Sequence, residues 1–216
     1  MIIDYDIVIV GLGPVGGTLA NLLGLNGLSV LVLEREASLY NLPRAVHFDD
    51  EIMRVFNTIG IANKISKKLI INKGTKFLDE KEKLILDWPR PKKITENGFY
   101  PSYRFHQPDL ERSLRLKLKK IENIDIKQNS TVEKITNKNN FVEVCYLDTN
   151  TNKNYIINSK YVVGCDGGRS FVREHIKSKM EDLGFRQKWV VIDVILKSNK
   201  TNLPDRTIQY CNSDRP

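Results

Sequence analysis

A glycine-rich turn near the N-terminus carries the most specific chemical information in the sequence. Its three glycines follow the spacing G-x-G-x-x-G, after an apolar run at residues 6–10 and before a helical pattern. The first glycine of such a turn permits a tight bend, the second lets a pyrophosphate approach the backbone, and the third allows the helix to pack closely on the strand. The helix N-terminus offers unpaired N–H groups and the positive end of a dipole to phosphates. The turn predicts a dinucleotide site with contacts from Gly11, Gly13, Pro14, Val15 and Gly16.

An acidic residue ends the second apolar run, where the ribose of a dinucleotide would lie. Residues 29–33 predict a buried strand, and Glu34 follows it. A carboxylate at this place accepts hydrogen bonds from the adenosine ribose hydroxyls and repels a 2′-phosphate, so the site favours FAD or NAD over NADP. Ala20 and Gly27 continue the small-residue spacing of an FAD-type fingerprint, and we expect Arg35 to contact the cofactor beside Glu34. The alternative, a glycine-rich turn of an α/β domain without a ligand, does not explain Glu34.

These residues need strands and helices to bring them together, and the apolar pattern predicts an α/β fold. A strand at 6–10, a helix at 18–26 and a strand at 29–33 make a βαβ unit with parallel strands. Asp49 is placed to cap a helix that ends at Gly60. From residue 124 the apolar period changes to two, which predicts the short strands of a β-meander. The other expected elements are a short helix at 61–69, a rigid strand-breaking segment at 88–91, a helix from Pro108 to 121, a strand at 161–164 with a second glycine turn at 165–168, and strands at 189–196 and 207–211.

Composition excludes several function classes. The 216 residues are 41% hydrophobic and 28% charged, and no apolar run approaches the roughly 20 residues that span a bilayer. The net charge of +8 comes from lysines spread in short clusters, which favours a solvated surface over a nucleic-acid partner. Cys145, Cys165 and Cys211 form no CxxC pair and indicate neither a disulfide framework nor a metal site. We therefore expect a cytoplasmic protein without a membrane, nucleic-acid or metal partner.

Five motifs occur in order along the chain. They are GLGPVGG at 11–17, PRAVHFDDEIMRVF at 43–56, WPRP at 88–91, SYRFHQPDLERSLR at 102–115 and GCDGGRSFVR at 164–173. Together they resemble the FAD-dependent aromatic hydroxylases, the single-component flavoprotein monooxygenases, and most of all the 3-(3-hydroxyphenyl)propionate/3-hydroxycinnamate hydroxylases. The resemblance covers essentially the whole chain. It implies FAD as cofactor, NADH or NADPH as co-substrate, hydroxylation of a phenolic acid with O2, and is compatible with a homodimer of the full-length enzyme.

The resemblance also assigns roles to individual residues. Asp166 and Gly167 match the family's second fingerprint, in which the aspartate contacts FAD and the turn also serves the pyridine nucleotide. Arg44 matches the arginine of a Pro-Arg-Ala motif, whose guanidinium can hold phosphate or flavin oxygens; the alternative is a surface arginine. Gln107 matches a glutamine that hydrogen-bonds the ribityl chain; the alternative is a polar residue at a helix N-terminus.

Two histidines, His47 and His106, are weak candidates for acid–base catalysis. In the family that the sequence resembles, the cofactor carries the hard step, while protein groups position the phenol. Packing, or a position near the flavin, is therefore the expected role of each histidine. No catalytic residue is assigned from the sequence.

One motif of the family has no counterpart here. The third fingerprint, a Gly-Asp pair, occurs nowhere in the chain. We therefore expect residues 1–180 to form a Rossmann-like FAD-binding domain that lacks its C-terminal portion, and residues 181–216 to begin a substrate-binding β-sheet. Such an N-terminal part of a longer monooxygenase would be poorly active alone. The alternatives are a non-catalytic dinucleotide-binding fragment, an NAD-linked dehydrogenase and another FAD-dependent oxidoreductase.

Overall fold

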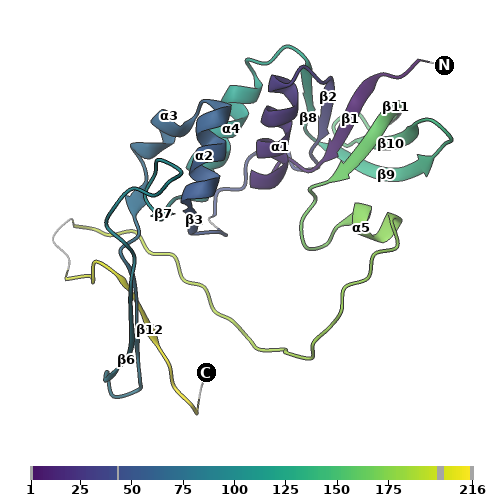
Figure 1. The fold of residues 1–216 in the computed structure, drawn as a ribbon. Helices are drawn as coiled ribbons and strands as arrows, with labels where there is room; N and C mark the ends of the chain where they lie inside the picture. The colour runs from purple at the N-terminus through teal and green to yellow at the C-terminus, as the bar shows by residue number, and fades with distance from the viewer. Residues whose placement is uncertain (1, 43, 199–201, 215–216) are drawn as a thin grey trace.

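Six strands form a mixed central sheet in the computed structural model, which describes residues 2–42, 44–198 and 202–214 (Figure 1). The strands are β1 (Tyr5–Val10), β2 (Val30–Leu33), β8 (Ile124–Lys127), β9 (Ser130–Asn137), β10 (Val142–Asp148) and β11 (Lys153–Gly164). Their order is β8-β2-β1-β11-β10-β9. The first four strands in this order pair in parallel, and β11, β10 and β9 form an antiparallel meander. The predicted α/β fold, with a parallel sheet and a β-meander, is confirmed.

The predicted βαβ unit opens the fold. Helix α1 (Pro14–Leu25) connects β1 to β2, and all four residues of β2 are buried. A strand covered on both faces explains the continuous apolar run in the sequence. The helix begins at Pro14, earlier than the expected 18–26, because a proline in the first turn needs no partner for a backbone N–H.

Helices cover the two faces of the sheet unequally (Figure 1). On one face, α1 and α4 (Gln107–Leu118) enclose an apolar cluster that includes Ile9 and Val32. On the other face, the short helix α5 (Phe171–His175) packs through Val172 against Val8 and the meander. On this face of the sheet the glycine turn before α1 therefore lies close to a second helix, α4.

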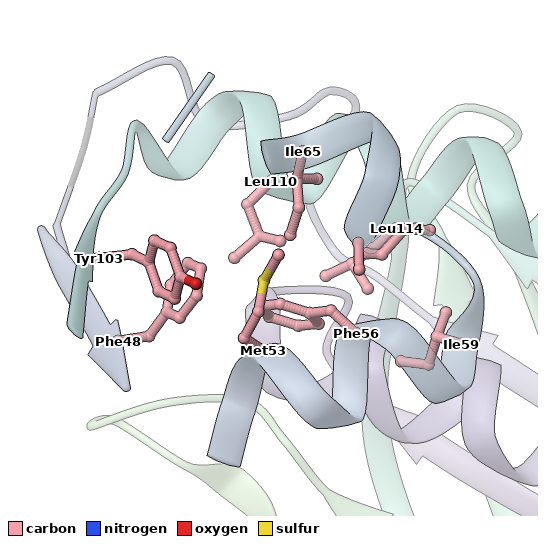
Figure 2. Packing of buried hydrophobic residues seen from close by; sticks show 10 residues of the cluster. Phe48, Met53, Phe56, Ile59, Ile65, Tyr103, Leu110 and Leu114 are labelled. Atoms are coloured by element: carbon pink, nitrogen blue, oxygen red, sulfur yellow. The ribbon is translucent and has the colours of Figure 1, made fainter. Parts of the chain in front are cut away.

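A further apolar core lies beside α4, away from the sheet (Figure 2). Phe56 meets Phe48 edge to face at 5.3 Å between ring centroids, and Leu110 and Leu114 of α4 close the cluster. Asp49 caps the second helix through its carboxylate, which accepts from the Ile52 N–H at 3.0 Å, as the sequence predicts. The elements that build this core are β3 (His47–Asp49), α2 (Asp50–Ile59), α3 (Ala62–Ser66), β4 (Ile70–Ile71) and β7 (Ser102–Arg104).

A separate three-stranded sheet consists of β5 (Gly74–Leu78), β6 (Leu84–Pro89) and β12 (Thr207–Tyr210), the last strand of the described chain. The expected strand at 207–211 is confirmed by β12, which pairs in parallel with β5. The expected strand at 189–196 is wrong. That stretch belongs to none of the three sheets of the described chain and so has no ladder of hydrogen bonds, and Ile195 is 96% exposed. The expected break at 88–91 begins later, since β6 extends to Pro89.

Asp6 of β1 contacts the chain of both neighbouring parallel strands, β11 and β2. Its carboxylate accepts from Lys160 Nζ of β11 at 2.6 Å, and from the N–H and hydroxyl of Ser29, next to β2, both at 2.9 Å. These contacts lower the pKa of Asp6 from 3.8 to about 2, and the hydrogen bond from Lys160 has the largest effect. The charged form of Asp6 therefore stabilises the fold.

We expect Asp6→Asn to lower the free energy of unfolding at pH 7, modestly because its partner Lys160 is exposed. A carboxyl whose pKa is lower in the folded chain stabilises the fold above its unfolded pKa, and this stabilisation is lost as the pH falls through the folded pKa. The free energies of unfolding of the wild type and Asp6→Asn, measured in urea, should therefore converge as the pH falls from about 4 to about 2. In a Lys160→Gln background the difference at pH 7 should shrink. A difference that stays constant down to pH 2 would contradict this role for Asp6.

Candidate functional site

In the glycine turn between β1 and α1, backbone atoms of different segments lie in close contact. Gly11 has φ +102°, and a Cβ there would overlap the carbonyl group of Cys165, which follows β11. A Cβ on Gly16 would overlap the carbonyl oxygen of Gly11. A Cβ on Gly13, in contrast, would meet no atom within 4 Å. Two of the three glycines are therefore required by packing, and the middle one faces open space.

The N-terminus of α1 is left without a side-chain cap. Gly13 is the N-cap residue and has no side chain to donate or accept, and Pro14 occupies the first turn. No acidic residue lies in that turn, and Val15 is exposed. The uncapped N–H groups and the dipole of a 12-residue helix favour an anion at this end.

Glu34 is buried at the end of β2 and holds the turn in place. One carboxylate oxygen accepts from the Leu12 N–H at 2.7 Å, and the other accepts from the Glu36 N–H at 2.9 Å. Each carboxylate oxygen has a second lone pair, so Glu34 can accept further hydrogen bonds. Arg35 is placed differently from Glu34, because its side chain lies at the surface and pairs with Glu36 at 3.2 Å.

The second glycine turn lies directly beside the first. The Cys165 N–H donates to the Val10 carbonyl at 2.7 Å, which joins the ends of β1 and β11. The Asp166 carboxylate accepts from the Ser170 hydroxyl at 2.5 Å and from the Val172 N–H at 3.2 Å, so it orders the start of α5. Gly167 has φ +81°, and a Cβ there would meet nothing within 4 Å. The fold thus brings both predicted turns to one edge of the sheet.

The Gln107 side chain contacts the backbone of Arg44 in the loop before β3. The buried Gln107 side chain accepts from the Arg44 N–H at 3.0 Å and from the Ala45 N–H at 2.8 Å. The exposed Arg44 guanidinium stacks over the Tyr40 ring at 4.3 Å. Pro43 of the Pro-Arg-Ala motif lies outside the described residues. Gln107 therefore orders the loop that carries Arg44.

Both histidines named as catalytic candidates are exposed. His47 pairs with Arg104 between β3 and β7, and His106 is the N-cap residue of α4. His106 Nδ1 lies 3.3 Å from the Asp109 carboxylate, whose pKa is held below its usual range chiefly by a hydrogen bond from Lys68. The structure gives neither ring a buried partner that would prepare it for proton transfer.

The Cys165 thiol, beside the two turns, is not activated as a nucleophile. Burial raises the pKa of the Cys165 thiol, which keeps it protonated and unreactive. No group of three or more His, Cys, Asp or Glu side chains within the described ranges is arranged to hold a metal ion. The helices of the described chain are all too short or too polar to cross a membrane.

Two polar residues of α4, the buried Glu111 and the partly buried Arg115, were not singled out in the sequence. Arg115 of α4 donates from Nη2 to the Leu12 carbonyl at 3.2 Å, and Glu111 accepts from Gln107 Nε2 at 2.8 Å. The signal was present, because these α4 residues are spaced four apart on one helix face. A cavity of about 270 Å³ adjoins the turn on the same side. Its lining residues are Leu12, Arg115, Leu118, Lys119, Ile121, Ile124, Ile126 and Gln128.

Known sequences that match this chain include an FAD binding domain family and several hydroxylases. The profile of the FAD binding domain family matches residues 4–214. A probable NADH-specific resorcinol 4-hydroxylase of Rhodococcus jostii (strain RHA1) is 35% identical over 213 residues, which are 98% of this chain and 39% of the relative. A 3-(3-hydroxy-phenyl)propionate/3-hydroxycinnamic acid hydroxylase of Burkholderia cenocepacia (strain HI2424) is 33% identical over 211 residues, 98% of this chain and 38% of the relative. The chain thus spans about two fifths of the length of these relatives.

Solved structures share the fold. The p-nitrophenol 4-monooxygenase PnpA from Pseudomonas putida DLL-E4 aligns with TM-score 0.72 and 27% identity, over 82% of this chain and 44% of that chain. The flavin-dependent monooxygenase PieE, solved in complex with FAD and substrate, aligns with TM-score 0.72 and 20% identity, over 82% of this chain and 33% of its own. The predicted Rossmann-like domain and the resemblance to flavoprotein monooxygenases are confirmed.

Alanine substitutions should separate the packing glycines from the open one. We expect Gly16→Ala to lower the free energy of unfolding by about 1–3 kcal/mol, because the added methyl group overlaps the Gly11 carbonyl. Gly13→Ala adds a methyl group in open space and should change stability by less than about 0.5 kcal/mol. Urea unfolding of both variants measures this. Equal destabilisation by the two substitutions would contradict the geometry of the turn.

Proposed function

Because the chain belongs to the FAD binding domain family, we propose that it binds FAD at the two glycine turns and serves as the FAD-binding part of a monooxygenase that hydroxylates a phenolic compound. The observation that carries the proposal is the meeting of both turns and the Glu34 carboxylate at one edge of the parallel sheet. In open α/β sheets this carboxyl edge is where nucleotides bind.

The residues present fit FAD. The open space at Gly13 and the uncapped start of α1 can receive a pyrophosphate. Glu34 keeps lone pairs for ribose hydroxyls, while the cavity beside Leu12 has room for part of the adenosine moiety. Asp166 and Gly167 lie in the adjacent second turn, where another hydroxyl-bearing part of the cofactor can bind.

The chemistry of the proposed reaction comes from the cofactor. Bound FAD, once reduced by a nicotinamide, supplies the electrons with which O2 is activated for hydroxylation. This chain's residues bind the cofactor, orient it and fix the two turns against each other. We assign proton transfer to neither His47 nor His106, because both side chains are exposed.

The names of the relatives support a phenolic substrate. Their names describe hydroxylases of resorcinol and of 3-(3-hydroxyphenyl)propionate or 3-hydroxycinnamic acid, which share a phenolic ring, and one is described as NADH-specific. We assign to this protein a small phenol as substrate and NADH as electron donor. We also assign residues 181–216 to the substrate side of the enzyme, which the exposed apolar side chains of 189–196 support.

Titration with FAD and with NAD⁺ tests the cofactor. We expect flavin fluorescence to show saturable FAD binding, tighter than the binding of NAD⁺. Gly13→Ala, which should fold normally, should weaken FAD binding by about tenfold or more, because its methyl group enters the space of the pyrophosphate. Tight binding of NAD⁺ without uptake of FAD would contradict the proposal and favour an NAD-linked dehydrogenase.

Glu34→Gln tests the ribose contact. The substitution keeps the size of the side chain and removes its charge, and hydrogen bonds to a charged group contribute about 1.5–3 kcal/mol. FAD affinity should therefore fall by about ten- to a hundredfold. Glu36→Gln is the matched control, because its exposed carboxylate pairs with Arg35 and should leave FAD affinity unchanged. An unchanged dissociation constant in Glu34→Gln would show that Glu34 does not contact the ribose.

A further inference from the structure

A row of three polar side chains, two of them buried and the third partly buried, runs along one face of α4. Gln107, Glu111 and Arg115 are spaced four residues apart, and the first two are only 6% and 5% exposed. Gln107 Nε2 donates to Glu111 Oε1 at 2.8 Å, and Arg115 Nη2 lies 3.7 Å from Glu111 Oε2. Buried charges cost free energy unless they are paired. We call these three residues the α4 polar row.

One end of the α4 polar row holds the glycine turn. Arg115 donates to the Leu12 carbonyl at 3.2 Å, while Glu34 accepts from the Leu12 N–H at 2.7 Å. The two peptide planes that flank Leu12 are thereby fixed from opposite sides. Since the C=O and N–H of a trans peptide point in opposite directions, Arg115 also sets the direction of the Gly13 N–H.

The other end holds the loop before β3. Gln107 Oε1 accepts from both Arg44 N–H and Ala45 N–H, at 3.0 and 2.8 Å. Glu111 orients the side-chain amide of Gln107 in turn, because its carboxylate accepts a hydrogen bond from Gln107 Nε2. Hydrogen bonds lead from the Arg44 loop to Glu111, whose ion pair with Arg115 continues the path to the glycine turn.

We propose that the α4 polar row is a positioning device that couples the glycine turn to the Arg44 loop, so that order at one segment favours order at the other. The ligand named for it, FAD, rests on the proposed function. The coupling itself is a property of the chain without ligand. Glu111 and Arg115 act through the backbone groups that they orient, and are positioning residues.

Amide hydrogen exchange of the FAD-free chain tests the coupling directly. Glu111→Leu should speed exchange of the Leu12 and Ala45 amides by about tenfold or more, because both ends of the row lose their orientation. Glu111→Gln keeps an oxygen for Gln107 but loses the charge beside Arg115, so it should speed exchange more at Leu12 than at Ala45. Amides of β10, far from the row, should be unchanged in both variants.

The matched control is Arg112→Gln, since Arg112 lies on the same helix, is exposed and pairs with Asp109. It should leave exchange at Leu12 and Ala45 as in the wild type. Faster exchange at all amides in Glu111→Leu would show that the row only stabilises the fold, and unchanged exchange at Leu12 and Ala45 would show that it positions neither segment. Either result would overturn the proposal.

A second measurement connects the row to the cofactor. Arg115→Gln and Gln107→Ala should each weaken FAD binding by about tenfold, and the double variant should lose less than the product of the two losses. Strict multiplication of the two losses would contradict coupling. If the wild-type chain binds no FAD, the proposed function fails, while the exchange measurement still decides on the α4 polar row.

Discussion

The close approach of Gly11 to both Gly16 and Cys165 is the constraint on which the site depends. It joins β1, the start of α1 and the end of β11 through backbone contacts that leave no space for side chains. Since β1 lies between β2 and β11, the same approach brings Glu34 and Asp166 to either side of the turn. The proposed FAD site is therefore a consequence of sheet order as much as of the individual residues.

Local patterns in the sequence were enough to predict most of the domain. The βαβ unit, the Asp49 cap and the β-meander each follow from neighbours in the sequence, and all three are confirmed. The two glycine turns were predicted as separate motifs. Their contact could be anticipated only from the parallel pairing of β1 with β11, which joins residues more than 150 positions apart.

Long-range hydrogen bonding explains what the sequence did not reveal. The resemblance assigned Gln107 to a ligand, whereas its side chain also orders the Arg44 loop and meets Glu111. The apolar pattern at 189–196 suits a strand, but a strand exists only with a partner, and no described strand pairs with it. Arg115 could be noticed by its spacing, but its partner, the Leu12 carbonyl, is 103 residues away.

The central claim is that the open side of the first glycine turn receives the diphosphate of FAD, and backbone NMR tests it most directly. In a ¹⁵N-labelled chain, addition of FAD should shift the amide signals of Gly13, Val15 and Gly16, together with those of Leu12 and Asp166. The signals of β9 and β10, distant from the turn, should stay in place. Binding of FAD that shifts other amides and leaves the glycine turn unchanged would contradict the account.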